Sequence, residues 1–423
     1  MSHRPILSRL TVATLALTTL AAGGVVSAAH ADALIAPAIT CPSTVAAVGF
    51  PVDFGELAKG ATALSVKSGT LPAGVSVSSE GGFHLAGDPT TVQASTFTLT
   101  ATFPSAPPAE VEKECAITVK PAPTVTRIAG SDRYQQALKV SAQFATAITV
   151  FVASGEKYPD ALSATAVAAA NKAPLLLTPS GSLPTGLLAE ITRLGATKVV
   201  VVGGENTISA TTFTQLKAAG RTVTRISGAD RYEVSRNLIS DPTVGIATAE
   251  NVFVATGANF PDALTASPAA IAARGPVLLV NGSEAAPTAL ESALLTKLGA
   301  KKVFIAGGTN SVSAALETSL SAGFTVTRFA GADRYAVGVN LNRAAFTAPG
   351  SFVLASGSAF ADALSGGVPA GLAKAPVYVT PATCLDNQVY LEIGRLAPEK
   401  IVVLGGTNTL SADVEALKPC GLD

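Results

Sequence analysis

Aspartate and arginine recur together in this chain at spacings that could support chemistry. The octapeptide RIAGSDRY, from Arg127, returns as RISGADRY from Arg225 and as RFAGADRY from Arg328. Each copy is followed by a second aspartate, in YPDALSA, FPDALTA and FADALSG. Two carboxylates can cleave a glycosidic bond, whereas guanidinium groups bind phosphate or carboxylate through paired hydrogen bonds. The recurrent residues are Asp132, Asp160, Asp230, Asp262, Asp333 and Asp362, with Arg127, Arg133, Arg225, Arg231, Arg328 and Arg334.

The surroundings of these residues favour binding over catalysis. Enzymes seldom carry three equivalent active sites in one chain, and no other acid recurs in all three copies. Residues 121–423 contain no histidine, which excludes a Ser–His–Asp triad and argues against a zinc amidase site. No P-loop or GxGxxG motif stands at the first strand turn of a copy. We therefore expect no enzyme activity, cofactor or metal; a hydrolase that uses Asp132, Asp160 and their equivalents is the alternative.

The same residues also have structural explanations. Asp160, Asp262 and Asp362 stand at expected helix starts, where the helix dipole favours a carboxylate. Their natural salt-bridge partners are Arg133, Arg231 and Arg334. The charged cluster either stabilises the fold or binds an anionic ligand through its arginines, and the two roles are compatible. The glycines after the expected strands either permit tight turns or expose N–H groups that cradle an anion; they include Gly203, Gly204, Gly307, Gly308, Gly405 and Gly406.

The motifs belong to a unit that is used three times. Apolar runs such as VFVA, PLLLT and KVVVV alternate with helix patterns, which is typical of parallel strands joined by right-handed crossovers. Each copy is therefore expected to be a flavodoxin-like or Rossmann-like α/β layer, with its motifs at the carboxyl rim, where such sheets bind ligands. The first copy should have strands at 124–128, 149–153, 174–178 and 198–202, with helices at 132–144, 160–171, 185–194 and 209–219. The copies should span 121–222, 223–325 and 326–423.

The N-terminal part has a different character. Residues 1–31 combine two arginines with an apolar run and end in Ala-His-Ala, the layout of a secretory signal peptide, and no later stretch could span a bilayer. Residues 33–120 contain short alternating or β-branched runs punctuated by Gly, Pro and Ser, which predicts a small all-β sandwich. Charged residues make up 14% of the chain and the formal net charge is zero, so neither a nucleic-acid-binding stripe nor a polybasic membrane patch is expected.

Four cysteines in an exported chain predict two disulfides. Three pairings are possible. The order along the chain favours Cys41 with Cys115 and Cys384 with Cys420, because each pair then lies within one domain.

RxxGxDRY, PDALSA, APLLLT and the VVGG segment that ends in SA follow one another in each copy. In this order they resemble the cell-wall-binding repeat 2 family of Gram-positive bacteria, over about residues 121–420. The resemblance implies a pseudo-threefold unit of three tandem modules that holds a secreted protein noncovalently on the wall through an anionic polysaccharide. It further implies polymer contacts at the six arginines named above and at the rim loops of Gly203, Gly307 and Gly405. Residues 71–91 with FTLTATF resemble the Ig-like domains of bacterial surface proteins.

Copy three departs from the family pattern. Ala361 replaces a proline, Val377-Tyr378-Val379 replaces a leucine-rich strand, and Cys384 enters the next loop. This copy should therefore bind less well or close the assembly instead. We predict an exported, wall-anchored surface protein whose Ig-like module faces outward as an adhesin or spacer toward a host or surface protein. The alternatives are a cell-wall hydrolase or amidase-associated protein, and a scaffold that binds a protein partner.

Overall fold

The computed structural model describes residues 36–42, 44–104, 107–218 and 220–421. The expected signal peptide, residues 1–31, lies outside this part of the chain. Within it, no helix has both the length and the apolar character that a bilayer crossing requires. From Pro37 onward the chain forms one compact unit.

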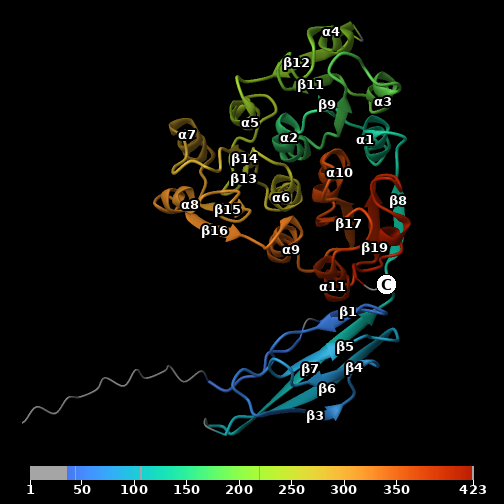
Figure 1. Ribbon diagram of the computed structural model, residues 1–423, viewed down its shortest axis with the longest axis vertical. Helices are drawn as coiled ribbons and strands as arrows, with labels where there is room; N and C mark the ends of the chain where they lie inside the picture. Colours follow the sequence, from blue (N-terminus) through green and yellow to red (C-terminus); the bar gives the residue numbers. More distant parts are fainter. Residues whose placement is uncertain (1–35, 43, 105–106, 219, 422–423) are drawn as a thin grey trace, which may run out of the picture. The chain divides into compact units, whose positions relative to one another are not determined.

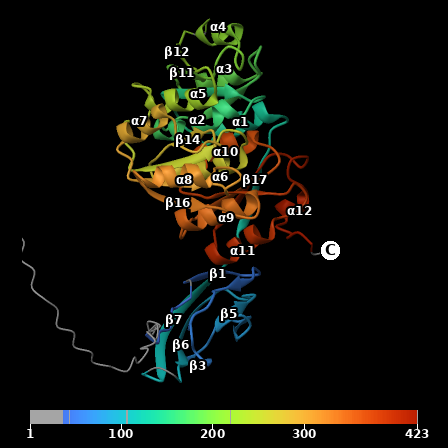
Figure 2. The same cartoon turned by 60° about the vertical axis from the view of Figure 1, so that its left-hand side comes forward.

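The β-module, residues 37–120, consists of two sheets on one core (Figure 2). Its four-stranded sheet contains β1 (Val45–Ala47), β7 (Glu110–Lys120), β6 (Gln93–Thr102) and β3 (Ala63–Gly69), in that order. Its three-stranded sheet contains β2 (Val52–Asp53), β5 (His84–Gly87) and β4 (Val75–Ser78). Alternate residues of β6, among them Phe97 and Leu99, point into the core, as the period-two pattern predicted. The predicted disulfide between Cys41 and Cys115 is confirmed and ties the first segment to β7.

The triple module, residues 121–421, contains three four-stranded parallel sheets, as predicted. The first consists of β9 (Thr149–Ser154), β10 (Leu175–Thr178), β11 (Lys198–Val202) and β12 (Thr222–Ile226), in the order β10-β9-β11-β12. The second consists of β13 (Asn251–Thr256), β14 (Val277–Val280), β15 (Lys302–Ala306) and β16 (Thr325–Phe329), in the order β14-β13-β15-β16. The third consists of β17 (Ser351–Ser356), β18 (Val377–Thr380), β19 (Lys400–Leu404) and β8 (Thr124–Ile128), in the order β18-β17-β19-β8.

Helices connect and cover these strands in the same sequence in each copy. The first copy has α1 (Arg133–Ser141), α2 (Pro159–Ala170), α3 (Leu187–Arg193) and α4 (Ala210–Ala218). The second has α5 (Arg231–Ser240), α6 (Pro261–Ala272), α7 (Ala289–Leu298) and α8 (Ala314–Ser321). The third has α9 (Arg334–Ala345), α10 (Ala361–Leu372), α11 (Asn387–Leu396) and α12 (Ala412–Glu415).

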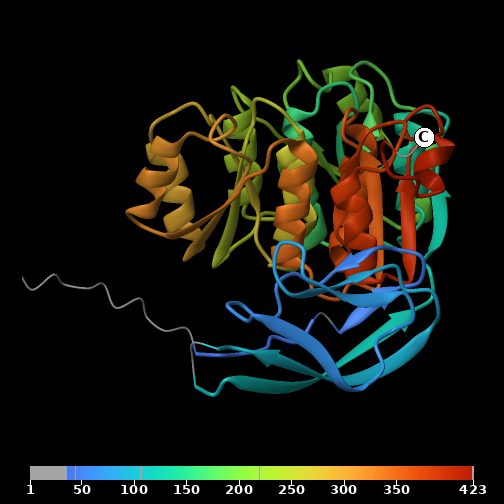
Figure 3. The same cartoon turned by 60° about the horizontal axis from the view of Figure 1, so that its bottom comes forward.

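Each sheet takes its outer strand from the next copy along the chain. Strand β12 of copy two completes the first sheet, and β16 of copy three completes the second. Copy three has no following copy, and β8 of copy one fills its place, with Val125 opposite Ile401 (Figures 1 and 3). The expectation that strand 124–128 belongs to the layer of its own copy is thus corrected. The three copies form a closed ring, because the same interface occurs at all three junctions.

Helices α2, α6 and α10 pack on one another at the centre of this ring (Figure 1). They are buried almost all round and rich in alanine, which allows their backbones to approach closely. Glycines bring α10 still closer: a Cβ added to Gly371 would lie 2.5 Å from Cδ1 of Ile271 on α6. The central packing therefore depends on small side chains.

The close approach at Gly371 can be tested by adding one methyl group. We expect Gly371→Ala to lower the free energy of unfolding by about 1–3 kcal/mol, because overpacking outweighs the gain in helix propensity of about 1 kcal/mol. Gly323→Ala is the control, since nothing lies within 4 Å of its added Cβ. Urea denaturation of both variants measures the difference. A Gly371→Ala protein as stable as the control would contradict this account of the centre.

Candidate functional site

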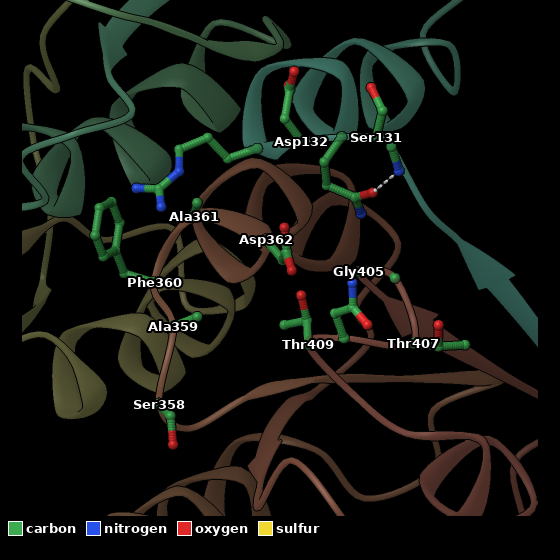
Figure 4. A pocket seen from close by; sticks show the side chains of 15 residues that line it. Ser131, Asp132, Ser358, Ala359, Phe360, Ala361, Asp362, Gly405, Thr407 and Thr409 are labelled. Carbon is green, nitrogen blue, oxygen red and sulfur yellow. Dashed lines mark hydrogen bonds between the residues drawn. The ribbon is translucent and has the colours of Figure 1, made fainter.

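The recurrent motifs meet in clefts between neighbouring copies rather than within one copy. The cleft between copies three and one, cleft 3–1, has a volume of about 420 Å³ (Figure 4). Copy one lines it with residues 130–133 and Gln136, and copy three with residues 358–362 and 405–409. The corresponding cleft 1–2 has a volume of about 620 Å³ and is lined by residues 156–160 and 204–207 of copy one and residues 227–231 and Val234 of copy two. The motifs predicted that these residues lie at the carboxyl rim of the sheets. Which two copies meet at a cleft is decided by the strand exchange between them.

A buried aspartate occupies the first turn of each central helix. Asp160, Asp262 and Asp362 are 8%, 6% and 7% exposed. Burial is the main cause that raises the pKa of each carboxyl above its ordinary value of 3.8. Hydrogen bonding to the hydroxyl groups of Thr207 and Ser311 opposes the rise at Asp160 and Asp262. These carboxyl groups are therefore closer to neutrality than surface aspartates.

The first glycine of each GG pair is required by its neighbouring aspartate. Gly203, Gly307 and Gly405 have φ angles of +112°, +114° and +98°. A Cβ added to them would lie 2.5, 2.5 and 2.3 Å from an aspartate Oδ2 atom. Only glycine fits such a position, so the structural explanation accounts for these three residues. The second glycines, Gly204, Gly308 and Gly406, have nothing within 4 Å of an added Cβ.

The charged partners of the buried aspartates come from the next copy. The pKa of Asp160 is lowered by the charge of Arg231, that of Asp262 by Arg334, and that of Asp362 by Arg133. Arg133 thus acts on Asp362 of copy three, and Asp160 of its own copy is acted on by Arg231 of copy two. No ion pair within 4 Å joins these groups in the described part of the chain. The attraction between them thus acts across the cleft.

The arginines of the DRY segments lie at the junctions between copies and keep part of their hydrogen-bonding capacity. Arg133 lines cleft 3–1, Arg231 lines cleft 1–2, and Arg334 lies beside Phe260 of copy two. In each, Nη1 donates to a glycine carbonyl at 2.6 Å, and the acceptors are Gly155, Gly257 and Gly357. Arg133 also lies over the ring of Phe360 at 5.6 Å, and Arg334 over Phe260 at 6.0 Å. Among the described residues, no other hydrogen bond is made by these three guanidinium groups. They can therefore donate to a ligand.

Sequence reasoning missed the aromatic residue before each PDAL or ADAL segment. The rings of Tyr158, Phe260 and Phe360 form a cluster with centroid separations of 5.4, 5.6 and 6.0 Å. Tyr158 also donates from its hydroxyl to the carbonyl of Ala258 at 2.8 Å. This cluster joins all three copies beside their DRY arginines. The recurrence of Tyr, Phe and Phe at one motif position was the signal that could have revealed it.

The aspartates of the DRY segments cap helices. Oδ1 of Asp132, Asp230 and Asp333 accepts two backbone N–H groups at 2.8–2.9 Å. Asp132 lines cleft 3–1 with Asp362, whereas Asp160 lines cleft 1–2 with Asp230. A hydrolytic site built from Asp132 and Asp160 together therefore has no geometric support.

The first arginine of each octapeptide is directed inward. Arg127 donates to Glu415 and to the carbonyls of Gly405 and Ser411, and its side chain is 11% exposed. Arg328 repeats this arrangement with Glu317, Gly307 and Ser313. Arg225 donates to Gly203 and Ser209 and lies over Phe213, and burial lowers the pKa of Arg225. These arginines fasten the exchanged strands to the neighbouring copy, and none lines either cleft.

The departures of copy three have a structural explanation. Tyr378 is fully buried, and its hydroxyl donates to Glu392, which also accepts from Arg343 and Arg395. The predicted disulfide between Cys384 and Cys420 is confirmed and fixes the segment after α12 to the loop after β18. Copy three thus carries extra bonds around β18 and α11.

The motifs and the closed ring identify a known family. Residues 127–213, 225–317 and 328–415 match the model of cell wall binding domain 2 (CWB2). The chain belongs to this family.

Two proteins of Bacillus subtilis (strain 168) are similar to part of this chain. N-acetylmuramoyl-L-alanine amidase LytC is 26% identical over 295 residues, which cover 69% of this chain and 57% of the relative. The amidase enhancer is 27% identical over 290 residues, which cover 68% of this chain and 39% of the relative. This chain thus spans only about half the length of these relatives.

Solved structures show the same fold. Cwp6 from Clostridium difficile aligns with a TM-score of 0.65 at 19% identity, covering 90% of this chain and 68% of its own. Cwp8 from the same organism aligns with a TM-score of 0.63 at 24% identity, covering 77% and 59%. The predicted unit of three tandem α/β modules is therefore confirmed.

The raised pKa values of the buried aspartates predict a pH-dependent stability. A carboxyl whose pKa is higher in the folded than in the unfolded CWB2 module stabilises the fold fully below the unfolded pKa, and this contribution is lost as pH rises through the folded pKa. The variant Asp160→Asn/Asp262→Asn/Asp362→Asn should therefore gain stability relative to the native chain between about pH 4 and pH 7. Urea denaturation at both pH values measures the change, with the exposed Glu80→Gln as control. A difference that is constant with pH, or that shrinks, would contradict this.

The two sets of arginines should differ in their effect on stability. Arg127→Met leaves a carboxylate and two carbonyls without their donor, so we expect a loss of about 1–3 kcal/mol. Arg133→Met removes one bond from an exposed side chain and should cost less than about 1 kcal/mol. Chemical denaturation of the two variants makes the comparison, and equal losses would show that Arg127 does not fasten the ring.

Proposed function

We propose that this chain is an exported surface protein held noncovalently on the cell wall, with its triple module bound to an anionic wall polysaccharide of the teichoic or secondary-polymer type. The observation that carries the proposal is the position of Arg133, Arg231 and Arg334. Each guanidinium stands at a junction of two copies and has donors that the fold does not use. Such donors suit phosphate or carboxylate groups of a polymer.

The threefold arrangement supports binding to a repetitive ligand. A polymer that engages one junction is held near the next, so weak contacts reinforce one another through effective concentration. Arg127, Arg225 and Arg328 point inward, so we remove them from the residues expected to contact the polymer. We therefore assign the polymer contacts to the DRY arginines and the half-buried second glycines, and fold maintenance to the first arginines.

The proposal assigns no wall-cleaving activity to this chain. The amidase named among its relatives is a longer protein, of which this chain matches 57%. The two carboxylates that line cleft 3–1 both have structural roles, because Asp132 caps α1 and Asp362 is buried in the first turn of α10. These observations favour a module that binds wall polymer rather than one that cuts it.

The β-module is proposed to be the part that faces outward. Its two sheets and stapling disulfide suit an Ig-like spacer or adhesin that contacts a host or surface protein. This role is separate from wall binding by the triple module, because none of the residues that line the two clefts belongs to the β-module.

Binding to purified walls tests the proposal. The variant Arg133→Met/Arg231→Met/Arg334→Met should bind native walls at least about tenfold more weakly than the native chain, because three charge-assisted contacts are lost. The matched control, Lys59→Met/Lys113→Met/Lys400→Met, removes the same charge from exposed positions outside the clefts.

Walls stripped of phosphodiester-linked polymer provide the second arm of this experiment. Sedimentation with these walls should retain little of the native chain. Full retention on stripped walls, or equal binding by the two triple variants, would contradict the proposal.

A further inference from the structure

The β-module contributes side chains to the core of copy three. Ala47 and Phe50 are 0% and 8% exposed, and both belong to the apolar cluster formed around α11 and β19. The ring centroid of Phe50 lies 5.3 Å from that of Tyr390 on α11. The β-module's own core is a separate cluster, which contains Phe97 and Leu99. Ala47 and Phe50 therefore pack on copy three rather than inside the β-module.

One glycine of α11 permits this contact. A Cβ added to Gly394 would collide with the carbonyl oxygen of Pro51, in the segment between β1 and β2. The segments TRL, TKL and GRL show that Thr192 of copy one and Thr296 of copy two occupy the corresponding positions. Both threonines are exposed, whereas Gly394 is buried. Copy three thus has the helix surface that fits residues 47–51.

The β-module is joined at the same time to copy one. Strand β7 ends at Lys120, and after residues 121–123, two of them prolines, the chain enters β8, which pairs with β19 of copy three. Strand β1 holds the end of β7, since the N–H of Val48 donates to the carbonyl of Lys120 at 3.0 Å. Val125 of β8 packs against the same apolar cluster as Phe50. One side of the β-module therefore binds copy three while its last strand leads into copy one.

The pairing of β8 with β19, junction 3–1, differs from the other two junctions in chain connectivity. Strands β12 and β16 each begin a few residues after the helix of the preceding copy, so their pairing closes short loops. At junction 3–1 the bond from Thr124 to Glu399 joins residues 275 positions apart. A longer loop costs more conformational entropy on closure. A β-module that holds β8 beside copy three reduces this cost, because it raises the effective concentration of the strand at its partner.

We propose that the β-module closes the ring: it binds α11 of copy three, continues into β8 of copy one, and so stabilises junction 3–1. The interaction surface is the face of α11 around Tyr390 and Gly394, and its partner is the segment 47–51 of the same chain. Because cleft 3–1 lies between copies three and one, the β-module also maintains this cleft. This function goes beyond the outward display proposed above, and it does not depend on which polymer the triple module binds.

Hydrogen exchange at the three junctions tests the proposal, with mass spectrometry of the full chain resolving β8, β12 and β16 in separate peptides. Gly394→Thr gives copy three the residue of the other two copies and should displace the β-module from α11. We expect the amides of β8 and β19 to exchange at least about tenfold faster, because junction 3–1 then opens locally more often. The amides of β11, β12, β15 and β16 should exchange as in the native chain. These two junctions are internal controls with the same strand pairing.

Phe50→Ser is the second variant, because it changes the interface from the side of the β-module and leaves the cluster around Phe97 intact. It should accelerate exchange in β8 and β19 in the same way. Gly323→Thr is the matched control, since nothing lies within 4 Å of a Cβ added to this exposed glycine, and it should leave all three junctions unchanged. Unchanged exchange in β8 in either interface variant, or an equal acceleration at all three junctions, would overturn the proposal.

Discussion

The exchange of one strand between neighbouring copies is the interaction on which the triple module depends. A four-stranded parallel sheet with helices on both faces is small, and its outer strand would otherwise present unpaired N–H and C=O groups. Here β12, β16 and β8 fill these places in turn, each fastened by an arginine that reaches the GG loop of the neighbour. The last pairing joins segments separated by 275 residues, as the bond from Thr124 to Glu399 shows. Removing one copy would therefore leave the sheet of one neighbour without its outer strand, and the strand donated by the other neighbour without a partner.

The clefts are a consequence of this exchange. Because β8 pairs with copy three, the DRY segment that follows it lies at the edge of that copy. There it lines the same cleft as the buried Asp362, which is in the first turn of α10. A single copy contains both motifs but cannot bring them together, since they stand at opposite junctions. The ligand recognition that we propose therefore depends on the closed ring. The same charged residues can stabilise the fold and contact a ligand, because those of one copy face those of its neighbour across an open cleft.

The central helices and the clefts are linked through the same few residues. Tyr158, Phe260 and Phe360 immediately precede the central helices, pack on one another and support two of the DRY arginines. The aromatic cluster therefore fixes the relative orientation of the three junctions. The symmetry is incomplete, because among the three copies only copy three has the buried Tyr378 network and a disulfide.

The residue pattern alone determined the three α/β copies, the two-sheet β-module, both disulfides and the rim position of the motifs. These features are local or follow from periodicity: apolar runs of four to six residues specify buried parallel strands, and glycine after a strand specifies a turn. The strand bounds in copy one agree with the structure to within one or two residues, as at Thr149–Ser154.

Only the tertiary structure decided which copies share a sheet, which arginine faces which aspartate, and which of the two arginines in each octapeptide is free to bind. Three nearly identical sequences offer three nearly identical edges, and the pattern contains no information on whether a strand joins its own copy or the neighbour. That choice is made by the crossover geometry and by ring closure, which pairs β8 with β19 across almost the whole triple module. The inward or outward direction of Arg127 and Arg133 follows from the same choice.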